Sequence, residues 1–339
     1  MGDRWHGGGR IPEMEANAIA SAGSDCDRLS VRVGIGMSPD GRDLIRNGEF
    51  WKIIETLEEV GYDSIWLSDT ASLGGLAPLP TLAAIAARTT RLKLGTNVLI
   101  LPPRNPVLLA RELATVDALS EGRMLPAGGL GIDLPAEMEA MGVQRGERTA
   151  RLEESIKILK ALWKGDPVTL SGRFWSLTDV TIVPLPHRQK LEIWLGGLAP
   201  AALERTGRIA DGWLASFVGP EEFGTNVDII RAAAAEHSRT IDEDHYGTTL
   251  YSAASSEDIP PSIIPLLDRR PGLSREDHVA IGADETRQLM ERFIAQGATK
   301  FVLIPFAKDT IAWLRELFSV AISPLEEHGA VRPKAQAPR

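Results

Sequence analysis

The chain has 339 residues, of which 43% are hydrophobic and 24% are charged, and these proportions are typical of a globular protein. Acidic residues outnumber basic ones by 46 to 37, and this negative balance argues against nucleic acid as a partner. The single cysteine, Cys26, excludes an intramolecular disulfide and a thiolate metal cluster. No apolar run has the length of a membrane span, so we expect a cytoplasmic protein that does not contact a membrane.

The chain alternates between short apolar runs and amphipathic segments from Leu29 onward. Strands are expected at 31–36, 64–69, 92–100, 122–131, 192–197, 212–216, 246–252 and 299–306. Helices are expected between and after them, at 50–61, 80–89, 105–120, 145–163, 200–209, 220–238, 283–296 and 309–323. Continuous apolar strands separated by helices indicate a parallel sheet that helices cover.

Eight such units predict an α/β protein built as a single (β/α)₈ TIM barrel over residues 29–325. A doubly wound open sheet is disfavoured, because it more often has five to seven strands and a glycine fingerprint after the first. Residues 1–28 are rich in Gly, Ala, Ser and charge without apolar periodicity, and they are predicted to be a disordered tail, as is the segment 326–339.

Two segments interrupt the regular pattern. Residues 165–186 alternate in polarity and contain turn glycines, which predicts a β-hairpin inserted after the fourth helix. Residues 253–278 are polar and rich in proline, and they follow the seventh strand. Because barrel enzymes place their sites at this end of the strands, the segment is either a lid over the site or a disordered surface insert without a catalytic role.

Several blocks carry a family likeness in their order and spacing. These are GYDSIWLSD at 61–69 and the segments 90–123, 151–163, 191–216 and 281–306. Together they resemble the bacterial luciferase-like family over most of residues 30–323. Within that family, the residues of these blocks are similar to those of the actinobacterial branch that uses the deazaflavin coenzyme F-420, with FMN-dependent monooxygenases as neighbours. The resemblance implies an oxidoreductase that binds this deazaflavin, or alternatively FMN, and forms a homodimer through its second and third helices.

The first candidate site residues end the second and third strands. Asp69 and Thr70 stand where relatives often have Asp-His facing the cofactor ring, although an Asp at a strand end is also a common turn former. In the run Gly95, Thr96, Asn97 and Val98, the resemblance implies a non-prolyl cis peptide between Asn97 and Val98 that lies behind the ring. The alternative for this run is an ordinary bulge or strand end.

Glycines end the fourth and fifth strands. Gly128, Gly129 and Gly131 lack side chains that would obstruct a planar cofactor, although Pro126 interrupts this strand. Asp133 follows, and the resemblance implies that an acid shortly after these glycines can face the substrate, although the spacing is shifted in this sequence.

Gly196 and Gly197 precede the helix that begins near Pro200. Unobstructed N–H groups at a helix N-terminus predict a phosphate site there, with a simple tight turn as the alternative.

Three functions remain open. The first is deazaflavin-dependent hydride exchange with a small organic substrate, the second is an FMN-dependent monooxygenase that uses oxygen, and the third is a non-catalytic flavin-binding barrel. The six histidines show no ligand spacing, so no metal site is predicted, and no motif of hydrolysis or phosphoryl transfer is present. Thr70 in place of histidine cannot act as a base, which favours reduction of an electron-poor C=C or C=N bond over alcohol oxidation. Asp133 acting as a base would instead restore alcohol oxidation.

Overall fold

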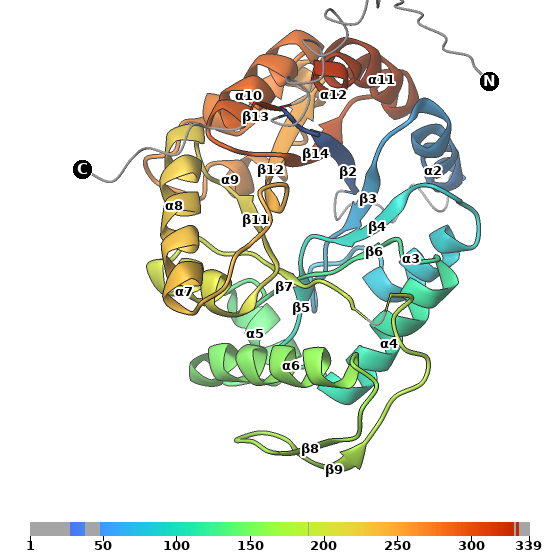
Figure 1. The fold of residues 1–339 in the computed structure, drawn as a ribbon. Coiled ribbons are helices and arrows are strands. Elements are labelled where there is room, and N and C mark those ends of the chain that lie inside the picture. The colour runs from blue at the N-terminus through green and yellow to red at the C-terminus, as the bar shows by residue number, and fades with distance from the viewer. Residues whose placement is uncertain (1–27, 38–47, 189, 329, 332–339) are drawn as a thin grey trace, which may run out of the picture.

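A computed structural model describes residues 28–37, 48–188, 190–328 and 330–331. The predicted N-terminal tail, except for its last residue, lies outside these residues. Eight parallel strands form the inner layer (Figure 1). In chain order they are β2 (Arg32–Met37), β3 (Ser64–Leu67), β4 (Lys93–Thr96) with β5 (Leu99–Ile100), β6 (Met124–Leu125) with β7 (Ala127–Gly129), β10 (Trp194–Leu195), β11 (Gly212–Ser216), β12 (Tyr246–Ala253) and β14 (Lys300–Phe306).

The strand pairing closes into a ring. β4 and β5 are successive parts of one strand interrupted at Asn97 and Val98, and β6 and β7 are parts of the next, interrupted at Pro126. β4 pairs with β6, and β5 pairs with β7, so the third and fourth strands are joined on both sides of the interruption. The remaining parallel pairs run from β7 through β10, β11, β12 and β14 to β2, β3 and β4. The predicted TIM barrel is therefore confirmed.

Helices cover the outside of the ring (Figure 1). They are α2 (Glu49–Val60), α3 (Pro78–Ala86), α4 (Pro106–Leu119), α6 (Arg148–Leu162), α7 (Pro200–Ile209), α8 (Pro220–Glu236), α10 (Ala283–Ala295), and α11 (Thr310–Leu317), which continues through a π-helical turn (Phe318–Ile322) into α12 (Ser323–His328). Their apolar sides and the outer faces of the strands form the main hydrophobic core, while a second cluster fills the interior of the barrel. None of the helices in the described ranges is long and apolar enough to cross a membrane.

Two elements differ from the sequence prediction. A short helix, α5 (Pro135–Met141), follows the fourth strand and ends at Gly142, whose φ is 62°. At the other end of the chain, β15 (Ala330–Val331) pairs antiparallel with β1 (Arg28–Leu29). Described elements therefore continue past residue 325, whereas residues 332–339 of the predicted C-terminal tail lie outside the described residues.

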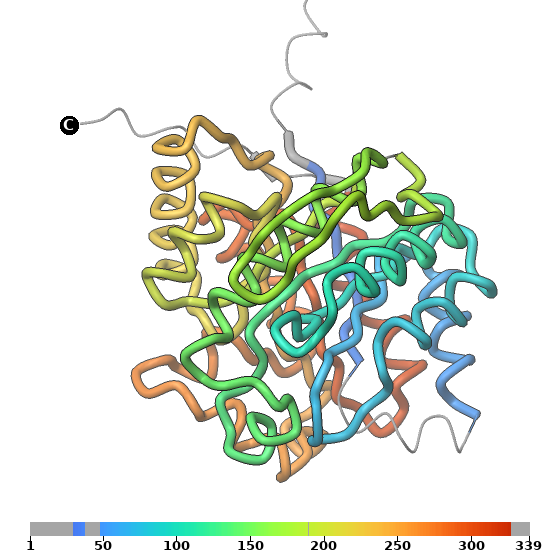
Figure 2. The backbone as a smooth tube through the Cα atoms, turned by 90° about the horizontal axis from the view of Figure 1, so that it is seen from below, coloured from blue at the N-terminus to red at the C-terminus, as the bar shows by residue number. Residues whose placement is uncertain are grey.

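The two insertions lie at opposite ends of the barrel (Figure 2). β8 (Val168–Ser171) and β9 (Ser176–Val180) pair antiparallel after α6, as the predicted hairpin requires. Residues 254–278, here called the insert, follow β12 at the C-terminal end of the strands, which we call the mouth. The insert contains α9 (Ile264–Leu267) and is followed by β13 (Val279–Ile281), which pairs with β12. Its buried Ile259, Ile263 and Leu267 join the interior cluster, so the insert packs against the barrel, while its role as a lid stays a prediction.

Candidate active site

The floor of the mouth is set by Trp66 of β3, whose side chain fills the middle of the barrel and is 1% exposed. Gly95 of β4 lies beside it, and a Cβ atom at this position would come within 2.2 Å of the indole ring. Gly34 of β2 is similarly close, and the indole N–H donates to Ser64 Oγ at 2.8 Å. Gly95 therefore makes room for Trp66 in the interior of the barrel. A cofactor contact at Gly95 stays a prediction.

The next layer contains the peptide between Asn97 and Val98, which is cis, as the resemblance implies. The Asn97 side-chain amide reaches across the barrel and donates to Thr249 Oγ1 of β12 at 3.0 Å, and the backbone carbonyl oxygen of Asn97 accepts from Ser68 Oγ at 3.0 Å. These two hydrogen bonds connect the interrupted third strand to β12 across the barrel and to the end of the neighbouring β3.

Thr96 restores the pairing that Pro126 weakens. Its hydroxyl donates to the carbonyl oxygen of Ala127 at 2.8 Å and accepts from the N–H of Ala127 at 2.9 Å. A proline cannot donate to the ladder, so this buried side chain replaces a backbone partner at the interruption. Thr96 thus holds the third and fourth strands together, while a direct cofactor contact stays a prediction.

One side of the mouth is flat because Val98 packs against two glycines. A Cβ atom at Gly129 would lie 2.6 Å from Val98 Cγ2, and one at Gly196 would lie 3.4 Å from Val98 Cγ1. We call these three residues the Val98 wall. At Gly128 and Gly129 the space that a Cβ atom would need is occupied by Leu101 and Val98, and a cofactor contact at these glycines stays a prediction. Gly131 lies beyond the wall with a φ of 81°.

Asp69 and Thr70 follow β3 at the rim of the mouth, and both side chains already have partners. The Asp69 carboxylate accepts from Arg104 at 2.9 Å and from the N–H of Ile100 at 3.0 Å. The Thr70 hydroxyl donates to the carbonyl oxygen of Gly74 at 2.7 Å. Asp69 therefore ties the second strand to the third, and Thr70 closes a turn in its own loop. Arg104 could not be predicted as the partner of Asp69, because the pair joins two loops that are 35 residues apart.

Asp133 lies farther out, with 45% of its side chain exposed. Its carboxylate pairs with Arg145 at 2.5 Å and with Arg148, at the start of α6, at 3.4 Å. The structure therefore connects Asp133 to a helix on the outside of the barrel and does not bring it together with Asp69 and Thr70 in one hydrogen-bonded group.

Glu137 of α5 is the clearest residue that sequence reasoning missed. It is fully buried, and its carboxylate accepts from the N–H groups of Ala71 (2.7 Å), Ser72 (2.6 Å) and Leu73 (3.0 Å), and from Ser72 Oγ at 2.6 Å. Burial raises the pKa of Glu137, but these hydrogen bonds outweigh it and hold the pKa below its usual value. Pro135 and Gly142 bracket α5 and could have indicated the helix, though not the partner of its glutamate.

The N-terminus of α7 opens beside the Val98 wall. Gly197 has a φ of 115°, which favours glycine. The helix starts at Pro200 with no side-chain cap and no acidic residue in its first turn, whereas α8 carries Glu221 and Glu222 there. Within the described ranges, the N–H groups of Gly197, Leu198 and Ala199 have no hydrogen-bond acceptor. Between these two helices, α7 is therefore the one suited to an anion.

The opposite side of the mouth is aromatic and was not predicted. Tyr251 of β12 stacks on Phe306 of β14 at a centroid distance of 6.1 Å and lies 5.7 Å from Phe217. We call these three residues the aromatic wall. The insert covers this wall, and its Arg269 guanidinium lies 4.0 Å from the centre of the Phe217 ring. The mouth therefore has a flat side formed by the third to fifth strands and an aromatic side formed by the last three.

Possible metal ligands lie away from the mouth. Asp242, Asp244 and His245 have ligand atoms within 4.8 Å of one another, but they precede β12 and so lie at the other end of the barrel. Near the mouth, His278 is buried, and its two ring nitrogens lie 3.1 Å from the carbonyl oxygens of Ser274 and Leu267. The absence of a metal site remains a prediction of the sequence.

Comparison with known proteins now places the chain. A family model described as luciferase-like monooxygenase matches residues 31–259. The chain belongs to this family. An F420-dependent glucose-6-phosphate dehydrogenase from Amycolatopsis mediterranei is 30% identical to it over 287 residues, which cover 80% of this chain and 85% of that protein. A protein of the same name from Microbacterium testaceum is 39% identical over 165 residues, so that match spans only 49% of the relative's length.

Solved structures of the luciferase-like family share the fold. A monooxygenase from Streptomyces bottropensis is 22% identical with a TM-score of 0.72, and the match covers 86% of this chain and 99% of that one. An F420-dependent secondary alcohol dehydrogenase is 17% identical with a TM-score of 0.74, and the match covers 90% and 100%. At these identities the likeness concerns the fold alone. The activity of this luciferase-like chain must therefore be inferred from the residues at the mouth of its own barrel.

Proposed function

We propose that this luciferase-like protein is an oxidoreductase that binds the deazaflavin coenzyme F-420 in the mouth of its barrel. The observation that carries the proposal is the continuity of the Val98 wall with the N-terminus of α7. Gly196 belongs to the wall, and Gly197 leads from it to three N–H groups without acceptors in the described part of the chain. A planar ring against Val98 with a phosphate at α7 fits this arrangement. The names of the curated relatives support the deazaflavin in particular.

The reduced deazaflavin supplies a hydride when it is bound. Val98 would hold the ring and the N-terminus of α7 would hold the phosphate, while Trp66 closes the floor of the mouth. Asp69 keeps the rim in place through Arg104 and Ile100. FMN also has a planar ring and a phosphate, so it is the alternative occupant, and with it the alternative function is an oxygen-using monooxygenase.

We further propose that the reaction is a reduction of an electron-poor double bond in a small organic substrate. Alcohol oxidation requires a base that accepts the hydroxyl proton. The Thr70 hydroxyl donates to Gly74, and the carboxylates of Asp69 and Asp133 are each paired with arginine. Each of the three predicted catalytic side chains therefore already has a partner, which favours the direction that needs no base.

The test compares two substitutions of the exposed Ala199, which lies at the N-cap of α7. Asp and Asn both cap a helix well, so Ala199→Asp and Ala199→Asn should fold alike. The aspartate adds a negative charge where the phosphate would bind, and we expect it to weaken deazaflavin binding about tenfold relative to the asparagine variant. Fluorescence titration with the oxidised deazaflavin, and separately with FMN, measures both affinities. Equal affinities for the two variants would place the phosphate elsewhere.

Two further measurements separate the alternatives. Oxygen consumption with reduced FMN, but no turnover with the reduced deazaflavin, would favour the monooxygenase. Tight binding of the deazaflavin without turnover of enones, imines or alcohols would favour the non-catalytic barrel.

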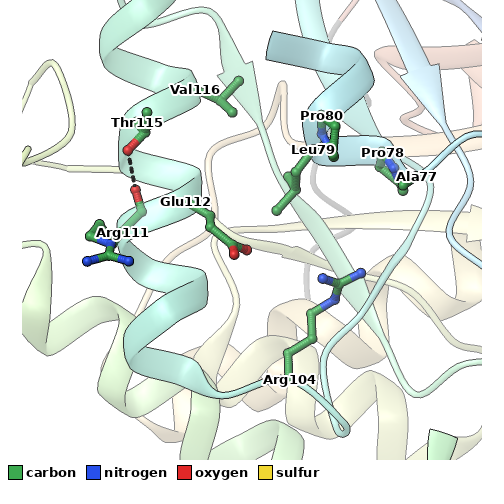
Figure 3. A pocket seen from close by; sticks show the side chains of 9 residues that line it. All are labelled: Ala77, Pro78, Leu79, Pro80, Arg104, Arg111, Glu112, Thr115 and Val116. Carbon is green, nitrogen blue, oxygen red and sulfur yellow. Dashed lines mark hydrogen bonds between the residues drawn. The ribbon is translucent and has the colours of Figure 1, made fainter.

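We also propose that the α3–α4 face forms a homodimer interface. Leu108 and Leu119 of α4 are 51% and 63% exposed. A pocket of about 410 Å³ lies between the two helices, and Arg104, which binds Asp69, is among its lining residues (Figure 3). We expect Leu119→Glu to shift wild-type dimers to monomers in sedimentation equilibrium, while Ile229→Glu on α8 does not. A wild-type protein that is monomeric at micromolar concentration would contradict this interface.

A further inference from the structure

We propose that Tyr251 is the acid that protonates the substrate, and that the substrate is an apolar conjugated carbonyl compound. This inference rests on the proposed deazaflavin-dependent reduction. It assigns to one side chain the proton that the reduction needs, and it assigns the aromatic wall to the substrate.

The strand register places Tyr251 in the mouth. Side chains two residues apart on a strand share a face, and Thr249 faces the interior, where it accepts from Asn97. Tyr251 therefore also faces the interior, one layer closer to the C-terminal end than the contact between Asn97 and Thr249. Its register partner on β14 is Ile304, another member of the interior cluster. Tyr251 thus lies across the mouth from the Val98 wall.

The hydroxyl group of Tyr251 has no hydrogen-bond partner among the described residues. Other acidic groups near the mouth are in use: Asp69 is paired with Arg104, and the ring nitrogens of His278 face carbonyl oxygens of the insert. The residue is 7% exposed, and its hydroxyl, unlike that of Tyr246, is not fully enclosed by the protein. A substrate oxygen in the mouth could therefore reach it and become its partner.

Arg269 makes Tyr251 suitable for proton donation. The neighbouring Arg270 is neutralised by Glu222, but Arg269 forms no ion pair within the described residues and stacks on Phe217. Burial raises the pKa of Tyr251 to about 12, and the charge of Arg269 opposes that rise. At neutral pH the phenol therefore stays protonated, and the phenolate left after donation has a cation nearby.

The surroundings of Tyr251 define the substrate class. Tyr251 belongs to the apolar interior cluster, together with Phe217, Phe306 and Ile304, while His278 and Arg269 lie at its edge. A ligand bound beside the phenol would bury hydrocarbon against this cluster while it places one oxygen at the hydroxyl. A conjugated ketone meets both conditions, whereas a polyhydroxylated sugar phosphate would leave many polar groups without partners.

The proposed reaction balances as follows. The C=C bond of the substrate breaks as its β-carbon gains the hydride, and the electron pair moves to the carbonyl oxygen. That oxygen takes the proton of the Tyr251 hydroxyl and forms an enol, which rearranges to the saturated ketone. The Tyr251 phenolate, stabilised by Arg269, regains its proton from water.

The kinetic test compares Tyr251→Phe with Tyr246→Phe. Tyr246 lies on the same strand but faces the helices, beside Arg231, so it controls for the loss of a buried phenol. With the reduced deazaflavin and cyclohexenone, we expect kcat of Tyr251→Phe to fall about 100-fold, which is typical of a lost general acid. Deazaflavin affinity should not change. A kcat within threefold of the wild type would overturn the role of Tyr251.

A second test needs neither cofactor nor turnover. The chain has three tyrosines, so 3-fluorotyrosine labelling gives three ¹⁹F resonances, which the two Phe variants assign. Cyclohexanone should shift the Tyr251 resonance alone, and Arg269→Gln should raise the pH at which that resonance titrates. A shift on adding glucose 6-phosphate, with none on adding cyclohexanone, would overturn the substrate class. Failure of the deazaflavin to bind would refute the proposed function and leave this ligand test standing.

Discussion

Replacing Glu137 with glutamine tests how the rim of the mouth is held. The carboxylate is fully buried and accepts four hydrogen bonds from residues 71–73. A hydrogen bond to a charged group contributes about 1.5–3 kcal/mol, but such contributions do not add. Glutamine keeps one acceptor oxygen and turns an N–H₂ group toward N–H donors. We therefore expect Glu137→Gln to lower the free energy of unfolding by about 2–4 kcal/mol.

Urea denaturation at pH 7 measures the loss, and Glu139→Gln, an exposed position on the same helix, is the matched control. Because the folded-state pKa of Glu137 is depressed, its stabilisation is fully present above the unfolded pKa and is lost as pH falls through the folded pKa. The gap between wild type and variant should therefore narrow in acid. Hydrogen exchange should also quicken at residues 71–73. A loss at pH 7 below about 0.5 kcal/mol, the scale of ordinary surface substitutions, would refute the reasoning.

Two further predictions concern the insert and the turn at Gly196 and Gly197 that precedes α7. Arg270 binds Glu222 and donates to the carbonyl oxygen of Phe217 at 2.6 Å. Arg270→Ala should therefore speed protease cleavage of the insert, while the urea midpoint of the barrel stays nearly constant. An unchanged cleavage rate would show that apolar contacts alone hold the insert in place. Gly197→Ala forces a side chain into a φ of 115° and should cost about 1–3 kcal/mol by urea denaturation, whereas Gly196→Ala meets only contacts of 3.4 Å and should be nearly neutral. Equal stabilities would contradict the strain argument.

The fold could be predicted because a parallel barrel leaves a strong local pattern. Strands buried on both faces have apolar sequences such as 301–306, and each strand is followed by an amphipathic helix. The hairpin after α6 was also readable, because its turn residues are local. The resemblance to the family located the cis peptide between Asn97 and Val98, which no periodicity indicates.

The partners of the site residues could not be predicted, because they are set by contacts between loops distant in sequence. Asp69 meets Arg104 35 residues later, and Glu137 meets the loop after β3 about 65 residues earlier. The side chain that packs against Gly129 could not be predicted either, since a glycine in a sequence does not reveal which neighbour occupies the space beside it. In the barrel that side chain is Val98.

Thr70, which stands where the family resemblance implies a histidine, and the position of Tyr251 favour the same proposed direction of chemistry. An alcohol dehydrogenase needs a base that is free to accept a proton, whereas Asp69 forms an ion pair with Arg104. A reductase needs a group that is protonated at neutral pH and faces the acceptor, and burial beside Arg269 gives Tyr251 that property. Because alcohol oxidation needs a base and the proposed ketone-forming reduction needs an acid, a base at position 70 alone should give little alcohol oxidation while the phenol remains across the mouth. The pair Thr70→His and Tyr251→Phe should therefore gain more alcohol oxidation than the sum of the single substitutions, and simple additivity would show that the two positions act independently.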